Sequence, residues 1–273
     1  MIDFLGSTHD FYEGKYFNEV HYRPHGRGLG RLPLWLIRSG HIWAVRREVE
    51  ADGVVVELGC AAGVRWFASA YRMIGLDFSK AALTRAAIDY RLGLCADALR
   101  IPLADESVDA VVSASFFEHI APSDKPLLLA ELMRILRPGG KIVFEHDVET
   151  ANPMIASYRK SDPALYNRLF LEGDGHTGYE PHATNDAHFR AAGFNLLWSQ
   201  TIERLPLQST DVYAKLGQWP GRRGRLSSFA ARMSRGVMAK PWQALIRIAD
   251  VSIGRLAPSS WGRIAITVAQ KPR

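Results

Sequence analysis

Residues 54–63 read Val-Val-Val-Glu-Leu-Gly-Cys-Ala-Ala-Gly, in which three β-branched residues lead into a carboxylate and then into a turn of small residues. Such a run is typical of a buried parallel strand whose carboxyl end receives a ligand. Gly59 and Gly63 allow the backbone to bend sharply and to approach that ligand without a Cβ in the way. Glu57 adds a negative charge at the strand end, which suits a cationic group on the ligand. A plain strand–helix turn without a ligand is the alternative for this segment alone.

The same turn lacks the fingerprint of a dinucleotide-binding fold. That fingerprint is G-x-G-x-x-G, with a pyrophosphate at the N-terminus of the following helix. Here Ala61 and Val64 stand at the second and third glycine positions. The sequence therefore disfavours a nicotinamide-dependent oxidoreductase, and the carboxylate favours a ligand that bears an ammonium group.

Strand and helix signals alternate over residues 54–147, which is the pattern of a doubly wound parallel sheet. We expect an α/β fold with a mostly parallel sheet of seven strands and a helical lid insertion. The predicted strands are 54–58, 73–77, 92–96, 109–113, 141–147, 194–202 and 263–269. The predicted helices cover 32–49, a segment capped by Ser79 that runs to about Tyr90, residues 125–136, and a short segment that Thr184 caps and Gly193 ends.

These elements divide the chain into four parts. We expect an N-terminal arm and helix (1–50), a core (51–202) with an irregular insertion at 148–183, a basic helical lid (203–262) and a final core strand (263–273). Tyr12, Tyr16 and Phe17 in the arm are candidates to close over the core as part of the lid. Packing of the arm on the sheet is the alternative.

Acidic residues recur where the predicted strands end. Glu57 ends the first strand, Asp77 the second and Asp97 the third, and Glu118 follows the fourth. A carboxylate at the end of the second strand is a natural acceptor for the two hydroxyls of a ribose. A single acid at a strand end is usually a cap or a solvated residue, but four at one edge of a sheet indicate a binding cleft.

These motifs together resemble the class I S-adenosylmethionine (SAM)-dependent methyltransferases, in particular the group of type 11 methyltransferase domains. The resemblance covers about residues 50–147, and it implies the methyltransferase fold, SAM as cofactor and methyl transfer as the activity. The matching segments are Val-Glu-Leu-Gly-Cys-Ala-Ala-Gly (56–63), Gly-Leu-Asp-Phe-Ser (75–79), Ala-Asp-Ala-Leu-Arg-Ile-Pro-Leu-Ala-Asp-Glu-Ser-Val-Asp (96–109), Glu-His-Ile (118–120) and Leu-Arg-Pro-Gly-Gly (136–140).

The resemblance also implies which residues contact the methionine part of the cofactor. Glu57 and the turn Gly59-Cys60-Ala61-Ala62-Gly63 would hold its amino-acid end, and Ser113 and Ala114 would line the methionine side. Ala61 departs from the family pattern, which most often has glycine there. A small residue is compatible with that position.

The nucleoside part has its own contacts under the same resemblance. Asp77 would accept the ribose hydroxyls, and Phe78 would pack against the adenine. Asp97 would accept from the adenine amine, and Ala98 would contribute its backbone N–H.

Methyl transfer from a sulfonium mainly requires alignment and exclusion of water, and positioning alone can supply about 7–11 kcal/mol of the barrier. A general base is needed only where the acceptor must lose a proton. His119 is the candidate, because it follows the fourth strand at the ligand edge; a structural hydrogen bond to a neighbouring loop is its alternative role. His146 and Asp147 end the fifth strand near the same edge.

Four further residues raise the question of a metal, namely His176, Glu180, His182 and His188. No pair of them has the spacing of a zinc motif such as H-E-x-x-H, and no cysteine accompanies them. The sequence therefore predicts a loop histidine cluster over the cleft and no metal.

The net charge of +6 is concentrated in one region. Residues 215–263 hold ten basic residues and one acid, or +9, while the rest of the chain has 24 basic and 27 acidic residues, or −3. One helical face there carries the apolar residues Trp242, Leu245, Ile246, Ala249, Ile253 and Leu256. We expect either a cap helix with solvated arginines or a surface that meets anionic lipid head groups or a phosphorylated acceptor. Nucleic acid is disfavoured, because no RNA-binding module accompanies the cluster.

Cys60 and Cys95 are the only cysteines and fit reduced structural thiols. With no signal peptide and no run of about 18 apolar residues, we expect a cytoplasmic chain, peripheral to the membrane if the basic region binds lipid. The expected function is SAM-dependent methylation of a small-molecule, glycan or lipid-linked acceptor. The alternatives are a non-catalytic scaffold that keeps the fold and an RNA methyltransferase. Acceptor, methylated atom and oligomeric state are left open.

Overall fold

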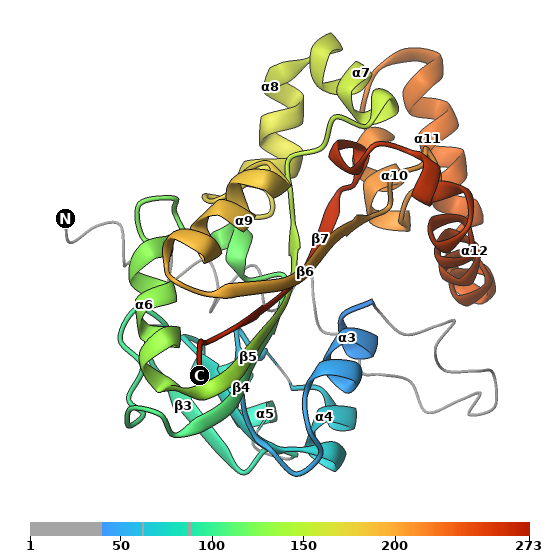
Figure 1. Ribbon diagram of the computed structural model, residues 1–273. Helices are drawn as coiled ribbons and strands as arrows, with labels where there is room; N and C mark the ends of the chain where they lie inside the picture. The colour runs from blue at the N-terminus through green and yellow to red at the C-terminus, as the bar shows by residue number, and fades with distance from the viewer. Residues whose placement is uncertain (1–39, 62, 87–88) are drawn as a thin grey trace.

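The computed structural model describes residues 40–61, 63–86 and 89–273, so Tyr12, Tyr16 and Phe17 lie outside the described residues. Its strands form one sheet in the order β3-β2-β1-β4-β5-β7-β6 (Figure 1). Strand β7 is antiparallel to β5 and β6, and the other pairs are parallel. The predicted α/β sheet is confirmed. Its strands are β1 (Val54–Leu58), β2 (Arg72–Asp77), β3 (Leu92–Cys95), β4 (Val108–Ala114), β5 (Leu136–Asp147), β6 (Asn195–Ile202) and β7 (Ile264–Gln270).

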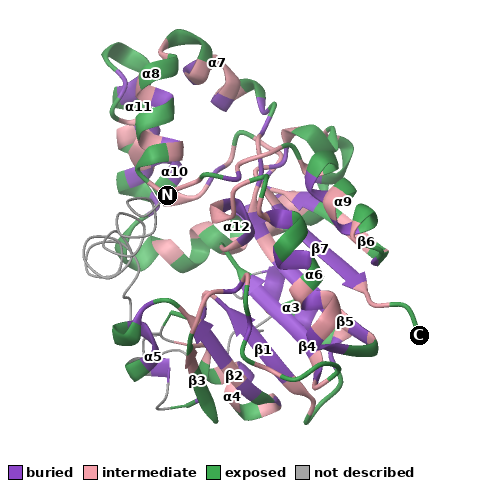
Figure 2. Cartoon of the chain, turned by 90° about the vertical axis from the view of Figure 1, so that its left-hand side faces the viewer, coloured by how far each residue is buried: buried purple, intermediate pink, exposed green. Residues whose placement is uncertain are grey.

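Helices cover both faces of this sheet, which is why the central strands are mostly apolar. Side chains alternate along β1, so that Val56 and Leu58 enter one core and Val55 enters the other. Figure 2 shows how completely these central strands are buried. The first core packs under α6 (Lys125–Ile135) and α9 (His182–Ala191), and the second under α3 (Gly40–Glu48), α4 (Arg65–Ala70) and α5 (Lys80–Ala86).

Two predicted boundaries were wrong. Helix α9 begins at His182, with Pro181 as its N-cap, so Thr184 lies inside the first turn and does not cap it. The Pro-Gly-Gly segment after α6 lies within β5, which already begins at Leu136; Gly139 adopts a φ of +79° there. Ser79 does cap α5, because its Oγ accepts a hydrogen bond of 3.1 Å from Ala82 N.

The insertion at 148–183 is more regular than expected. It contains α7 (Pro153–Ser161), α8 (Pro163–Tyr166) and the π-helical turn η4 (Asn167–Glu172). The side chains of Asn152 and Asp162 accept hydrogen bonds from the first turns of α7 and α8. Because proline is well tolerated at the first helical position, each Asx-Pro pair starts a helix.

The second lid segment adds α10 (Thr210–Leu216), α11 (Gly221–Met233), η5 (Gly236–Met238), α12 (Ala239–Val251), η6 (Ile253–Leu256) and η7 (Ser259–Trp261). Helices α7, α8, α10 and α11 lie together beyond the carboxyl ends of the parallel strands (Figure 1). Their apolar residues form a small core of their own, in which Ile155 and Tyr158 pack with Val212, Leu216 and Trp219. Among the described residues, no helix combines the length and the apolar character that crossing a bilayer requires.

Candidate active site

Three of the described residues in the turn after β1 lie in the left-handed region of backbone space. The φ angles are +60° at Gly59, +45° at Ala61 and +73° at Gly63. Glycine adopts such angles readily, whereas an alanine is disfavoured there by contact of its Cβ with the backbone. Ala61 N donates a hydrogen bond of 2.9 Å to Oδ2 of Asp77. The turn is thereby linked to the end of β2, where the resemblance predicted the ribose contact.

Close packing explains two of the small residues around this turn. A Cβ at Gly59 would lie 2.8 Å from Cδ2 of Phe116, and a Cβ at Gly75 would lie 2.8 Å from Sγ of Cys60. Cys60 is buried, and this burial raises the pKa of its thiol. The side chain of Cys60 is therefore neutral and packs in the core. At this position only the backbone of Cys60 is available to contact a ligand.

Glu57 is buried at the end of β1 and is paired with a phenol. The hydroxyl of Tyr90 donates to Oε2 of Glu57 and accepts a hydrogen bond of 2.7 Å from Val64 N. Burial raises the pKa of Glu57 to about 8, the negative charge of Asp77 adds to the rise, and the Tyr90 hydrogen bond opposes it. At neutral pH this carboxyl is therefore largely protonated, and a cation bound beside it would favour its ionised form.

The carboxylates at the ends of β2 and β3 are oriented by backbone donors. Oδ1 of Asp77 accepts from Ser79 N at 2.9 Å, and Oδ1 of Asp97 accepts from Leu99 N at 2.8 Å. A carboxylate has about four lone-pair sites, so such bonds orient the group and are compatible with a ligand. Phe78, between them in the chain, is 37% exposed and has a face that a flat ring can contact.

The remaining residues predicted for the cofactor differ in exposure. Ala98 is buried in the first core. Ser113 is buried, and its Oγ donates to Leu58 O at 3.0 Å, so the hydroxyl links β4 to β1. Ala114 is exposed at the end of β4. Of the pair at this strand end, Ala114 is the residue with surface available to a ligand.

A cavity of about 410 Å³ lies next to this strand end, between the core and the lid. Ser115 and η3 (Phe117–His119) contribute from the β4 side, and α10 contributes from the lid. Its polar lining includes Glu118, His119, Asp147, Asp174, His176, Lys215 and Arg263. Since Ser115 directly follows Ala114, the cavity adjoins the predicted methionine side of the cofactor site.

Arg263 joins the core to the lid at the floor of this cavity. Its Nη1 donates to both carboxylate oxygens of Asp147 at 3.0 Å, and its Nη2 donates to Oε2 of Glu203 at 2.8 Å. The two acids raise the pKa of the guanidinium, against the effect of burial. A second pair, Lys215 with Asp174, spans from α10 to the loop after η4. Sequence reasoning did not single out Arg263 or Lys215 as site residues.

Glu118 and His119 reach the cavity from η3. Oε1 of Glu118 accepts from Asp147 N at 3.2 Å, while its Oε2 is buried with no hydrogen-bond partner among the described residues. Burial, and then the charge of Asp147, hold the pKa of Glu118 well above its usual range. Nδ1 of His119 donates to Gly175 O at 3.0 Å, and its ring lies 5.1 Å from that of His176. The candidate base therefore lines the cavity.

The other histidines named from the sequence have structural partners or lie under the site. His146 is buried against Phe117, with ring centroids 5.4 Å apart, and this burial lowers its pKa to about 3. It therefore stays neutral and does not line the cavity. His188 and Lys125 both contact Oε2 of Glu180, at 3.1 and 2.6 Å. His182 contacts Ser199 at 2.6 Å. The predicted loop histidine cluster is thus divided, and only His176 of it reaches the cavity.

Comparison with known proteins relates the core to methyltransferases. Residues 56–144 match the family model of the methyltransferase domain. An arsenite methyltransferase from Halobacterium salinarum is 30% identical over 113 residues, which are 36% of this chain and 28% of that protein. A malonyl-[acyl-carrier protein] O-methyltransferase from Yersinia pestis is 37% identical over 114 residues, which are 39% of this chain and 41% of that protein. The chain thus matches less than half the length of these curated relatives.

One solved structure extends the likeness to most of the fold. The phosphoethanolamine N-methyltransferase 2 of Haemonchus contortus, solved in complex with SAM, gives a TM-score of 0.53 at 16% identity. The match covers 85% of this chain and 52% of that one. The prediction of a Rossmann-like methyltransferase fold is confirmed.

Proposed function

Because residues 56–144 form a class I methyltransferase domain, we propose that this chain is a SAM-dependent methyltransferase. The observation that carries the proposal is the fixed turn after β1, where Ala61 N is bonded to the carboxylate of Asp77. The positive φ angles of this turn let the backbone approach a ligand closely, and the carboxylates of Asp77 and Asp97 are oriented beside it. This arrangement suits a cofactor that has an ammonium group at one end and a ribose diol in the middle.

The chemistry of the residues present suits SAM. Glu57 and the turn would hold its amino-acid end, Asp77 its ribose hydroxyls, Phe78 and Asp97 its adenine. When bound, SAM supplies an activated methyl group on a sulfonium. Ala114 would face the methionine side, next to the cavity that is open to an acceptor.

The chain's own contribution is to position the acceptor and to exclude water. The lid helices cover the cavity, and the Arg263 ion pairs hold the lid to the strand ends. His119 lines the cavity and is our candidate to hold a proton from an acceptor hydroxyl or amine. Proton transfer of this kind contributes typically about 10²–10⁴-fold to a rate.

The acceptor class is suggested by the outer surface of the lid, residues 221–256, which we call the basic apolar surface. It holds the exposed basic residues Arg222, Arg223, Arg225, Arg232, Arg235, Lys240 and Arg255 against the single acid Asp250. It also exposes an unusual number of large apolar side chains, namely Leu226, Phe229, Met233, Val237, Met238, Leu245, Ile248, Val251, Ile253 and Leu256. Val237 is 93% exposed and Leu256 85%.

The apolar residues that the sequence places on one helical face in this region are partly buried and partly exposed. Ile246 and Ala249 of α12 are buried and Trp242 donates to Gln208 O at 2.9 Å, whereas Leu245 and Ile253 are exposed. On α11, Leu226, Phe229 and Met233 follow helical spacing on one exposed face. Apolar side chains between arginines suit an anionic bilayer, because the apolar side chains can insert into the membrane while the arginines contact the lipid head groups.

We therefore propose that the basic apolar surface binds anionic membrane and that the acceptor is a lipid or lipid-linked molecule. The test is co-sedimentation with vesicles of phosphatidylcholine and phosphatidylserine, against pure phosphatidylcholine. The double variant Arg222→Glu/Arg225→Glu loses two positive charges. We expect its free energy of binding to anionic vesicles to weaken by at least about 2 kcal/mol, which is about 30-fold in the partition coefficient. Phe229→Asp should also weaken binding, whereas Leu127→Asp on α6, equally exposed at 57%, should not. Equal binding by all variants, or preferred binding to RNA, would contradict the proposal.

Methyl transfer can be tested without a known acceptor. The protein is incubated with SAM labelled in its methyl group, together with either a membrane-lipid extract or an aqueous metabolite extract. We expect label in the lipid fraction. Label only in the aqueous fraction would exclude the lipid acceptor, and bound SAM without transfer to either extract would favour the scaffold alternative.

A further inference from the structure

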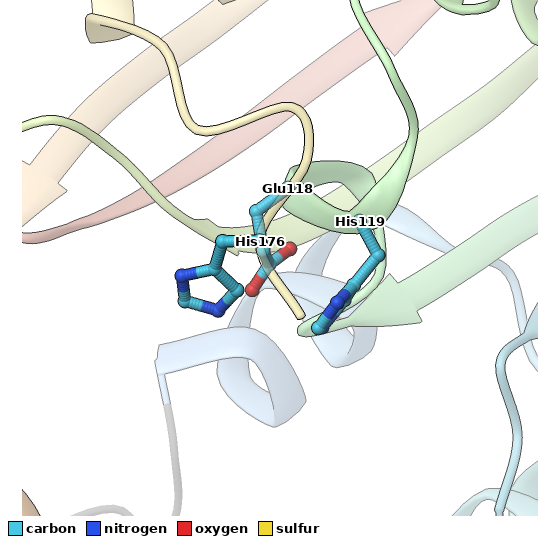
Figure 3. A group of neighbouring side chains, drawn as sticks. All are labelled: Glu118, His119 and His176. Atoms are coloured by element: carbon cyan, nitrogen blue, oxygen red, sulfur yellow. The ribbon is translucent and has the colours of Figure 1, made fainter. Parts of the chain in front are cut away.

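Three potential metal ligands from two distant segments meet in the cavity. Glu118 and His119 come from η3, and His176 comes from the loop after η4. One donor atom of each lies within 4.8 Å of those of the other two. Figure 3 shows the Glu118 carboxylate between the two imidazole rings. Sequence spacing could not reveal this group, because His176 comes next to Glu118 and His119 only in the fold.

Two members of the group each have a buried side-chain atom without a protein partner. Oε2 of Glu118 and Nδ1 of His176 have no hydrogen-bond partner among the described residues, and Glu118 is 1% exposed. A buried polar atom without a partner is costly, and such atoms call for a ligand or an ion. The two side chains come from different segments and meet in one cavity, as the ligands of a bound cation would.

Nearby protein cations do not fill this role. The ammonium of Lys125 directs its three donors to Gly178 O, Glu180 and Asn185, at 2.8, 2.6 and 2.7 Å. Arg263 is bonded to Asp147 and Glu203, and Lys215 to Asp174. Lys125 acts on Glu118 by charge alone, so none of these cations donates a hydrogen bond to Oε2 of Glu118.

The two segments are held together by backbone contacts. Gly178 N donates to Glu118 O at 2.8 Å, and Oγ1 of Thr177 donates to His119 O at 2.5 Å. A Cβ at Gly178 would lie 1.8 Å from Ile120 O, so only glycine fits this approach. The cluster is therefore built by the fold and is not a chance meeting of mobile side chains.

Contacts outside the cluster orient its members in the way that metal ligands require. Nδ1 of His119 donates to Gly175 O at 3.0 Å, and Oε1 of Glu118 accepts from Asp147 N at 3.2 Å. A backbone carbonyl on one imidazole nitrogen fixes the tautomer and the ring plane of a metal-ligating histidine, and ligating carboxylates are likewise hydrogen-bonded.

We propose that Glu118, His119 and His176 bind a divalent first-row transition metal ion such as Mn²⁺ or Zn²⁺. Two imidazoles and one carboxylate match the preferences of these ions and not those of Mg²⁺ or Ca²⁺, which favour oxygen ligands. Three protein ligands leave coordination positions open toward the cavity. There, an oxygen of the acceptor would complete the sphere, and the ion would orient it and lower its pKa. In the ion-bound protein this replaces the proton transfer proposed for His119, because Nδ1 of His119 donates to Gly175 O and Nε2 is then a ligand. This role rests on the proposed methyltransferase function, but binding of the ion does not.

The test is calorimetric titration of metal-free protein with Mn²⁺ or Zn²⁺ alone. We expect one ion per chain, with affinity reduced at least about 10-fold in Glu118→Gln and in His176→Asn. Asp211→Asn is the matched control, because Asp211 is an exposed acid that lines the same cavity and is not a member of the group. It should bind the ion as wild type does, which separates ligation from general attraction of cations by an acidic cavity.

A second readout guards against variants that fail to fold. Thermal unfolding of the metal-free variants should resemble that of wild type, and added ion should raise the midpoint of wild type and Asp211→Asn only. Absence of binding by wild type, or unchanged affinity in both ligand variants, would overturn the proposal. SAM binding is measured separately on the same samples: metal binding without SAM binding would overturn only the proposed function, and the reverse only this inference.

Discussion

The backbone N–H of Ala61 and the carboxylate of Asp77 are joined by a hydrogen bond of 2.9 Å. This bond crosses from the turn after β1 to the end of β2 and holds Ala61 at a φ of +45°. The one position at which the turn departs from the glycine-rich family pattern is therefore also the position that carries backbone strain.

That strain can be measured by substitution. Ala61 is exposed, so a larger side chain meets no core atoms, but a β-branched residue is strongly disfavoured in the left-handed region. We expect Ala61→Val to lower the free energy of unfolding by about 1–2 kcal/mol, and Ala61→Gly to change it by less than about 1 kcal/mol. Urea denaturation of the three proteins measures both. An Ala61→Val variant as stable as wild type would show that the turn is not held in this conformation.

Glu57 predicts a pH dependence of stability. Its pKa is about 8 in the folded protein and near its ordinary value in the unfolded chain, so the folded state holds the proton more tightly. Its contribution to stability is complete below pH 4.5 and is lost as the pH rises toward 8. The free energy of unfolding of wild type minus that of Glu57→Gln should therefore fall by about 1.4 kcal/mol per pH unit across this window. Other groups, such as Glu118, Glu145 and His41, cancel in this difference. Parallel curves for the two proteins would contradict the buried, protonated carboxyl.

Tyr90 is the partner that keeps Glu57 in place. Tyr90→Phe removes the donor to Glu57 and the acceptor for Val64 N, which leaves two buried polar groups unpaired. We expect a loss of about 1–3 kcal/mol in the free energy of unfolding, measured by chemical denaturation. Because the Tyr90 hydrogen bond lowers the pKa of Glu57, the slope described above should extend to higher pH in this variant. A loss below half a kcal/mol would argue against the bridge.

Arg263 is expected to be the most sensitive ion pair between core and lid. Its side chain is 13% exposed and faces two acids, Asp147 and Glu203. Arg263→Leu leaves both acids without their cation and should cost about 3–5 kcal/mol. Arg65→Leu is a suitable control, because Arg65 is 73% exposed and its pair with Asp89 is worth at most about 1 kcal/mol. Equal effects of the two changes on the melting temperature would contradict this view of the lid contact.

The sheet was predictable because its signals are local. Three valines before Glu57 and the acids that end successive strands follow from the chemistry of buried parallel strands, and the strand limits differ from prediction by few residues. The lid was less predictable. Helices α7 and α8 begin at Asn152-Pro153 and Asp162-Pro163. The composition of this segment, rich in Gly and Pro, instead predicted an irregular insertion.

The site was predictable only where it follows strand ends. The contribution of Tyr90 depends on α5 folding back over the turn after β1, and that of Arg263 depends on β7 entering the sheet next to β5. The approach of His176 to Glu118 depends on the backbone contact at Gly178, which no spacing rule describes. Such contacts join residues that are distant in the sequence. The residues on the cofactor side of the cleft could therefore be predicted from the sequence, but those on the acceptor side could not.

The measurement that tests the central claim most directly is calorimetric titration of SAM into wild type and Asp77→Ala. We predict that wild type binds one SAM per chain and that Asp77→Ala binds at least about 100-fold more weakly, since it loses two hydrogen bonds to a charged group at about 1.5–3 kcal/mol each. Asp105→Ala, which removes a carboxylate that is 74% exposed, should bind as wild type does. No SAM binding by wild type, with no loss on Asp77→Ala, would contradict the account.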